Sequence, residues 1–98
     1  TGDFNSHAET TVPWTNATAK GLKDAWTVAQ ERIGARYTFG GFRPLEEGKE
    51  GRIDWILVRG PVEVVKCETV TYNVDGRFPS DHFPIFADLR IAAPAQKE

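Results

Sequence analysis

The chain has 98 residues, a formal net charge of −2 at pH 7 and an isoelectric point near 5.7. With 40% apolar and 27% charged residues, the composition fits one globular unit that can form a core, and it argues against disorder. The acidic balance excludes the basic field on which non-specific nucleic-acid binding depends. A polyanionic substrate would therefore require a metal ion to offset charge repulsion.

Two further classes of protein are disfavoured by the sequence. No apolar stretch approaches the roughly 20 residues that a membrane-spanning helix needs, so we expect no membrane partner. The single cysteine, Cys67, permits no disulfide within the chain. Cys67 lies in an alternating run, where a small half-buried residue is a better interpretation than a reactive thiol.

Two helices are predicted after the short strand at the start of the chain. Residues 11–33 show an interrupted helical pattern, in which Pro13 suits a first turn and Gly21 suits a stop. Asp24 is placed to cap a second segment whose apolar residues continue to Ile33. The pattern predicts two short helices.

Strands follow the helices. Residues 37–39 are β-prone and run into two glycines, which predicts a short strand ending in a sharp turn. Residues 44–51 form a charged surface loop. Residues 53–58 are apolar on both faces, which is typical of a central strand covered twice.

The last part of the chain predicts two more strands. Residues 62–72 read as a half-exposed strand, Asp75 and Gly76 as a tight turn, and residues 84–91 as a strand with one core face. Residues 92–98 are small and polar and predict a disordered tail. The whole order indicates an α+β fold whose helices cover one face of the sheet.

Several polar residues do not fit a purely structural interpretation. Asp54 is a carboxylate within an apolar strand, so it needs a hydrogen-bonding or charged partner. Asp81 and His82 are held between Pro79 and Pro84, just before the last strand. A histidine held by a buried carboxylate stays in one tautomer. A satisfied core aspartate and an ordinary surface histidine remain the alternative.

The segment at residues 2–5, GDFN, adds an acid and an amide. In an extended strand end, Asp3 and Asn5 would lie on the same side while Phe4 points into the core. By itself this tetrapeptide is weak support for function. His7 follows closely and is open to two interpretations, a substrate contact or an exposed loop residue.

Taken together and in order, three motifs resemble a known family. GDFN at residues 2–5, GRIDWILV at 51–58 and PSDHFPIFADL at 79–89 look like the C-terminal half of the endonuclease/exonuclease/phosphatase superfamily, the deoxyribonuclease I-like phosphoesterases. The stretches LKDAW at 22–26 and YTFGGF at 37–42 are similar to a bacterial subgroup. The resemblance covers residues 1–91.

The resemblance implies a fold. In that family two related halves pack as a four-layer α/β/β/α sandwich, and this chain would supply one half, with one mostly antiparallel sheet and helices on one face. Residues 1–91 would make up this C-terminal half domain. The family's metal site lies at one edge between the sheets.

The resemblance also implies roles for five residues and a cofactor. Asp3 would activate or orient the nucleophile and help to bind the metal, and Asn5 would hold a phosphoryl oxygen. Asp54 would pair with His82, which would stabilise charge on the phosphate, and Asp81 would belong to the metal shell or its outer sphere. Carboxylate and amide oxygens suit Mg²⁺ (or Mn²⁺) better than zinc.

The family's N-terminal half, with its metal-binding glutamate, has no counterpart in this sequence. We therefore expect the chain to carry part of a site and to lack efficient activity alone. We also expect its second apolar sheet face to associate with the missing half or with another copy. The substrate class stays open among phosphodiesters, phosphomonoesters and nucleic acid, and a non-catalytic binding or scaffolding module that retains the fold is the rival interpretation.

Overall fold

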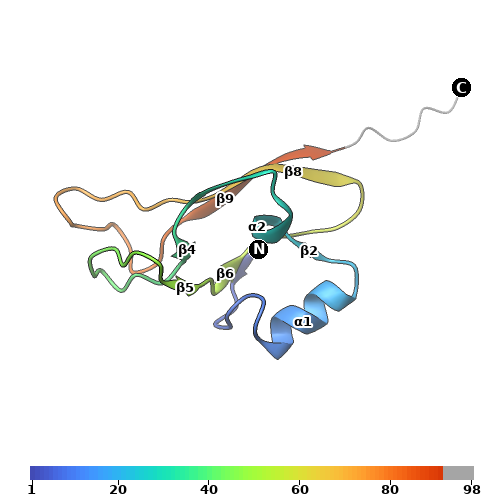
Figure 1. Ribbon diagram of the computed structural model, residues 1–98, viewed down its shortest axis with the longest axis horizontal. Helices are drawn as coiled ribbons and strands as arrows, with labels where there is room; N and C mark the ends of the chain where they lie inside the picture. Colours follow the sequence, from blue (N-terminus) through green and yellow to red (C-terminus); the bar gives the residue numbers. More distant parts are fainter. Residues whose placement is uncertain (92–98) are drawn as a thin grey trace, which may run out of the picture.

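The computed structural model describes residues 1–91, which form a small mixed α+β fold made mostly of short strands with few helices (Figure 1). The predicted tail, residues 92–98, lies outside the described part. In chain order the elements are β1 (Gly2–Asp3), α1 (Val12–Ala19), β2 (Lys23–Asp24), α2 (Ala25–Val28), β3 (Glu31–Gly34), β4 (Arg36–Tyr37), β5 (Glu50–Gly51), β6 (Asp54–Trp55), β7 (Leu57–Val58), β8 (Val62–Thr69) and β9 (Ile85–Ile91).

Within residues 1–91 the strands form four separate ladders, so the prediction of a single sheet is wrong, whereas three of the five strand pairings are antiparallel, as predicted. The largest is β3-β8-β9, in which β3 pairs with β8 in parallel and β8 pairs with β9 antiparallel. The predicted strand at residues 53–58 is divided because its pairing partner changes along the chain. β5 pairs with β4, β6 with β1 and β7 with β2. The four-layer sandwich implied by the resemblance stays a prediction.

Two short helices are present, as predicted, but the second is shorter than expected. Helix α1 has proline in its first turn, and Asp24 caps α2 by accepting a hydrogen bond of 3.0 Å from the Trp26 backbone N–H. Helix α2 ends at Val28, and Ile33 lies in strand β3 opposite Glu68 of β8. Pairing with β8 therefore overrides the helical pattern there.

Helix α2 packs on strand β8 to make the larger core, which contains Ala25, Trp26, Ala29, Val58, Val64 and Cys67. Cys67 is buried rather than half-buried, and burial raises the pKa of its thiol. Helix α1 has no buried residue and lies apart from the β3-β8-β9 sheet (Figure 1). Only one helix therefore covers that sheet. Neither helix within residues 1–91 has the length and apolar content to cross a membrane.

Residues 53–58 are covered on both sides, as their pattern predicts. Trp55 is 1% exposed and stacks on Phe4, with ring centroids 4.3 Å apart and an interplanar angle of 15°. On the other side, Ile56 and Val58 pack into the α2 core. Several large apolar residues on the last strand and on the loop after β4 stay exposed. They include Phe39, Phe42, Leu45, Leu89 and Ile91.

The remaining turn prediction is confirmed, and the strand limits are close to those expected. Val74 and Arg77 form an antiparallel bridge around Asp75 and Gly76, both of which have positive φ. Strand β8 ends at Thr69, three residues before its predicted limit, and β9 begins one residue after its predicted start. A second, smaller core of aromatic residues contains Tyr37, Phe78 and Phe83.

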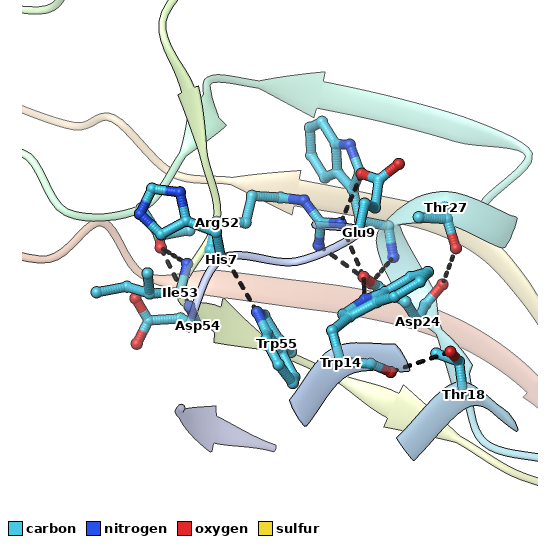
Figure 2. A network of polar contacts seen from close by, with 12 residues as sticks. His7, Glu9, Trp14, Thr18, Asp24, Thr27, Arg52, Ile53, Asp54 and Trp55 are labelled. Carbon is cyan, nitrogen blue, oxygen red and sulfur yellow. Dashed lines mark hydrogen bonds and ion pairs between the residues drawn. The ribbon is translucent and has the colours of Figure 1, made fainter. Parts of the chain in front are cut away.

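A buried ion pair ties the first half of the chain to the segment that carries β6 (Figure 2). Asp24 accepts two hydrogen bonds from the Arg52 guanidinium, at 2.8 and 3.0 Å, and one of 2.7 Å from the Trp14 indole N–H. The Asp24 side chain is 0% exposed and that of Arg52 6%. Arg52 also reaches Glu9 at 3.2 Å. This network connects α1, α2 and the strand segment around residue 52.

We predict that Arg52→Met lowers the free energy of unfolding by about 3–5 kcal/mol, because it leaves Asp24 as an uncompensated buried charge. Urea unfolding followed by tryptophan fluorescence measures the loss. The matched control is Arg90→Met, which removes an ion pair with Glu63 whose two side chains are 70% and 46% exposed. The control should cost less than about 1 kcal/mol. Equal losses for the two variants would contradict this account.

Candidate active site

The centre of the candidate site is a hydrogen bond between Asp54 and His82. Asp54 begins strand β6, and His82 lies in the loop before β9. Asp54 Oδ2 is 2.8 Å from His82 Nδ1. Because an ionised carboxylate only accepts hydrogen bonds, Nδ1 carries the donated proton. This bond fixes the ring's orientation and leaves Nε2 available on the other side.

The loop that carries His82 is fixed by the neighbouring chain as well as by its prolines. The backbone N–H groups of Gly40 and Gly41 donate to the Asp81 carbonyl at 2.8 and 2.9 Å, and Phe83 N–H donates to the Thr38 carbonyl at 2.7 Å. A Cβ at Gly40 would lie 2.7 Å from the Phe83 ring, so only glycine permits this approach. These contacts hold His82 in place against residues 38–41.

Asp3 joins the pair from strand β1. It lies directly opposite Asp54 in the antiparallel β1-β6 ladder, and its Oδ2 is 3.7 Å from His82 Nε2. One ligand atom from each of Asp3, Asp54 and His82 lies within 4.8 Å of the others. The structure therefore brings together three of the five residues predicted from the sequence.

Asn5 and Phe4 are not placed as the extended-strand interpretation predicts. Strand β1 ends at Asp3, and Asn5 adopts a left-handed conformation with φ of 49°. The Asn5 backbone N–H donates a 2.8 Å hydrogen bond to Asp3 Oδ1. Phe4 is 38% exposed and covers Trp55 instead of entering a core. The turn at Asn5 therefore orients the Asp3 carboxylate, which leaves its Oδ2 on the side of His82.

Asp81 is close in sequence to His82 but outside the three-residue cluster. Within residues 1–91, the cluster contains Asp3, Asp54 and His82 alone among acids, histidines and cysteine. The Asp81 backbone carbonyl is engaged by the glycines of the facing loop. Its carboxylate acts on the site through its negative charge, which contributes to the raised pKa of His82.

The electrostatics of the site favour a protonated histidine. The hydrogen bond to Asp54 raises the pKa of His82 above its ordinary value of about 6.5, partial burial opposes the rise, and the charges of Asp54, Asp3 and Asp81 add to it. A protonated imidazole can donate from Nε2 to a phosphate oxygen. When protonated, His82 therefore adds a positive charge to a site otherwise lined by carboxylates.

A pocket of about 220 Å³ borders the pair. It is lined by Asp54 and His82 together with residues of the first strand and of the loop before β9, including Gly2, Ser80 and Pro84. His7 borders a different cavity, beside Glu9 and Arg52 (Figure 2), where its ring covers Gly51. The structure therefore does not place His7 in the Asp54–His82 cluster.

The residues present fit part of a site for a hard divalent cation. Asp54 is committed to His82, which leaves the Asp3 carboxylate as the oxygen donor available to a metal ion. Mg²⁺ is commonly held by one or two carboxylates together with water and substrate phosphate. A single protein carboxylate beside a histidine is thus compatible with Mg²⁺ or Mn²⁺, and it does not resemble a closed zinc site.

Solved structures share this fold. An endonuclease/exonuclease/phosphatase family protein from Bacteroides thetaiotaomicron superposes with a TM-score of 0.80 at 30% identity, over 89% of this chain and 33% of that chain. A mannosyl-6-phosphatase from the same species gives 0.78 at 31% identity, over 91% and 36%. An endonuclease/exonuclease/phosphatase from Bacteroides vulgatus gives 0.74 at 30% identity, over 87% and 33%.

These structures confirm the resemblance to the endonuclease/exonuclease/phosphatase superfamily that the three motifs indicate. The chain spans about a third of the length of the structures it matches, which is consistent with one half of that fold. No protein-family model matches the sequence, and no curated protein does. One of these structural neighbours is a mannosyl-6-phosphatase by name.

We predict that Asp54→Asn lowers the pKa of His82 toward its ordinary value, because the charged acceptor is lost. NMR titration of the two histidines measures this, with His7 as the internal control. Since the pKa of His82 is raised in the folded state, its stabilising contribution is complete below about pH 6.5 and is lost as the pH rises through the folded pKa.

The free energy of unfolding of the unchanged protein should therefore fall as the pH rises above about 6.5, and the fall should be smaller in Asp54→Asn. An unchanged His82 titration in the variant would contradict the assigned hydrogen bond.

Proposed function

We propose that the protein that contains this chain hydrolyses a phosphoester with the help of a divalent metal ion. The observation that carries the proposal is the cluster of Asp3, Asp54 and His82, in which a carboxylate-held imidazole faces a second carboxylate. Phosphoester hydrolysis needs a directed nucleophile and compensation for negative charge. This cluster offers one group for each requirement.

The roles follow from the contacts. His82, held by Asp54, donates from Nε2 to a phosphate oxygen and stabilises the charge that develops there. Asp3, whose Oδ1 is held by the Asn5 backbone, orients the attacking water through Oδ2. Asn5 would hold a phosphoryl oxygen with its side-chain amide, and Asp81 would act from the outer sphere.

The metal ion is part of this proposal. Asp3 would hold Mg²⁺ or Mn²⁺, and such an ion supplies Lewis-acid stabilisation of phosphate oxygens. Because the chain offers one free carboxylate here, further ligands would come from the rest of the fold, from water or from substrate. This is the reason why we expect the chain alone to lack efficient activity.

We propose that the substrate is a small phosphate ester in preference to duplex DNA. The net charge of −2 gives the chain little long-range attraction for a polyanion. The mannosyl-6-phosphatase among its structural neighbours also supports a small phosphate ester as the substrate. Nucleic acid remains a candidate substrate. The alternative to an enzyme is a binding or scaffolding protein that retains the fold. Such a protein would need the shape of the fold but not the Asp54–His82 pair.

We predict that the protein that contains this chain hydrolyses a phosphomonoester or phosphodiester only with Mg²⁺ or Mn²⁺, and that a chelator abolishes turnover. His82→Ala should reduce kcat by about 10²–10³-fold, because it removes a donor to the developing charge. Turnover of p-nitrophenyl phosphate and bis-p-nitrophenyl phosphate measures both effects.

The matched control is His7→Ala, which removes the other histidine and should leave kcat nearly unchanged. The 98-residue chain is assayed in parallel and should show little turnover. Robust turnover in the presence of chelator, or equal losses for the two histidine variants, would refute the proposal.

We also propose that the chain associates with a complementary half of the fold or with a second copy. Leu89 and Ile91 of β9 are 43% and 71% exposed, and β9 is paired on one edge only among the described strands. The unpaired backbone N–H and C=O groups of such an edge can form hydrogen bonds with a strand of another chain.

We predict that analytical ultracentrifugation of the chain alone shows concentration-dependent association, which the double substitution Leu89→Lys and Ile91→Lys weakens. The exposed residues Val12 and Val28, changed to lysine, serve as the control. A soluble monomer at all concentrations would count against this part of the proposal.

A further inference from the structure

Thr38 lies between the two parts of the candidate site, the strand segment at Asp54 and the loop at His82. It directly follows strand β4 and is 0% exposed. Its side-chain oxygen accepts hydrogen bonds from the backbone N–H groups of Ile53 and Asp54, at 2.9 and 3.2 Å. The hydroxyl therefore holds the peptide from which the Asp54 side chain projects.

The backbone of the same residue holds the histidine loop. The Thr38 carbonyl accepts a 2.7 Å hydrogen bond from Phe83 N–H, and Phe39 forms an antiparallel bridge with His82. The Phe39 and His82 rings also meet edge to face, with centroids 5.3 Å apart. One short segment thus contacts the strand that carries the carboxylate and the loop that carries the imidazole.

We infer that the Thr38 hydroxyl is a positioning group for the Asp54–His82 pair, setting the backbone at Asp54 so that Oδ2 meets His82 Nδ1. The inference rests on the proposed function only where it calls this pair part of a catalytic site. Hydrogen bonds weaken steeply with distance and angle, so a small shift of the Asp54 backbone would break a bond of 2.8 Å.

A different role for Thr38 predicts a different result. If Thr38 only filled space, valine, which has nearly the same shape, would replace it without consequence for His82. If the hydroxyl positions Asp54, valine leaves two partly buried N–H groups without this acceptor, and the backbone around Asp54 shifts toward another acceptor or water. Serine keeps the hydroxyl and should preserve the pair.

The readout is the tautomer of His82, because the hydrogen bond to Asp54 selects the Nδ1–H form, whereas free histidine in water favours Nε2–H. ¹⁵N chemical shifts of the two ring nitrogens report the tautomer directly. They are recorded on the 98-residue chain without metal or substrate, at a pH where the ring is neutral. His7 is recorded in the same spectra as the internal reference.

The expected result is a predominantly Nδ1–H ring at His82 in the unchanged chain and in Thr38→Ser, and loss of that predominance in Thr38→Val. Thr69→Val is the matched control, because Thr69 is 1% exposed and its hydroxyl has no hydrogen-bond partner within residues 1–91. It removes an equally buried hydroxyl and should leave the His82 tautomer unchanged.

If Thr38→Val does not fold, Thr38→Ala is used, since its smaller side chain leaves room and avoids pressing a methyl group against the unsatisfied N–H groups. A folded Thr38→Val or Thr38→Ala that keeps the Nδ1–H tautomer would overturn the inference, and so would an equal change in Thr69→Val. Because no turnover is measured, the result stands apart from whether the protein cleaves phosphoesters.

Discussion

The hydrogen bond between Asp54 and His82 is the contact on which the candidate site depends. It joins strand β6, which pairs with β1, to the loop before β9, which pairs with β8. The antiparallel pairing of β1 with β6 then brings Asp3 to the same place. Without the Asp54 carboxylate, His82 would lose both its fixed orientation and the main cause of its raised pKa. The chemistry proposed here therefore rests on the register of the short β1-β6 ladder and on the position of the loop before β9.

The segment at residues 50–58 serves both stability and the site. Arg52 points to a buried carboxylate, Asp24, while Asp54, two residues later, points to the histidine (Figure 2 shows both side chains). The ion pair anchors the segment against α2 and the loop near Glu9. The same segment pairs successively with β4, β1 and β2. Its placement is thus determined by several weak ladders and one buried ion pair, rather than by one large sheet.

The sequence predicted the proximity of Asp3, Asp54 and His82 better than the arrangement of the sheet. Asp54 stood out because an acid inside an apolar strand needs a partner, and the ordered motifs indicated His82 and Asp3. The ladder partners of residues 50–58 could not be predicted, because strand pairing is a non-local choice that the hydrophobic pattern alone does not fix. Asn5 was misplaced because a left-handed turn at a single asparagine leaves no periodic signal. Thr38 was missed for a related reason, since its hydroxyl acts on residues 15 and 16 positions away.

The most direct test of the central claim is a crystal structure of the protein with Mn²⁺ and orthovanadate, which mimics the transition state of phosphoryl transfer. The account predicts a vanadate oxygen within hydrogen-bonding distance of His82 Nε2, with Asp54 still bound to Nδ1. It also predicts an anomalous manganese peak beside the Asp3 carboxylate. Vanadate and manganese bound elsewhere, or a His82 ring turned away from Asp54, would contradict it.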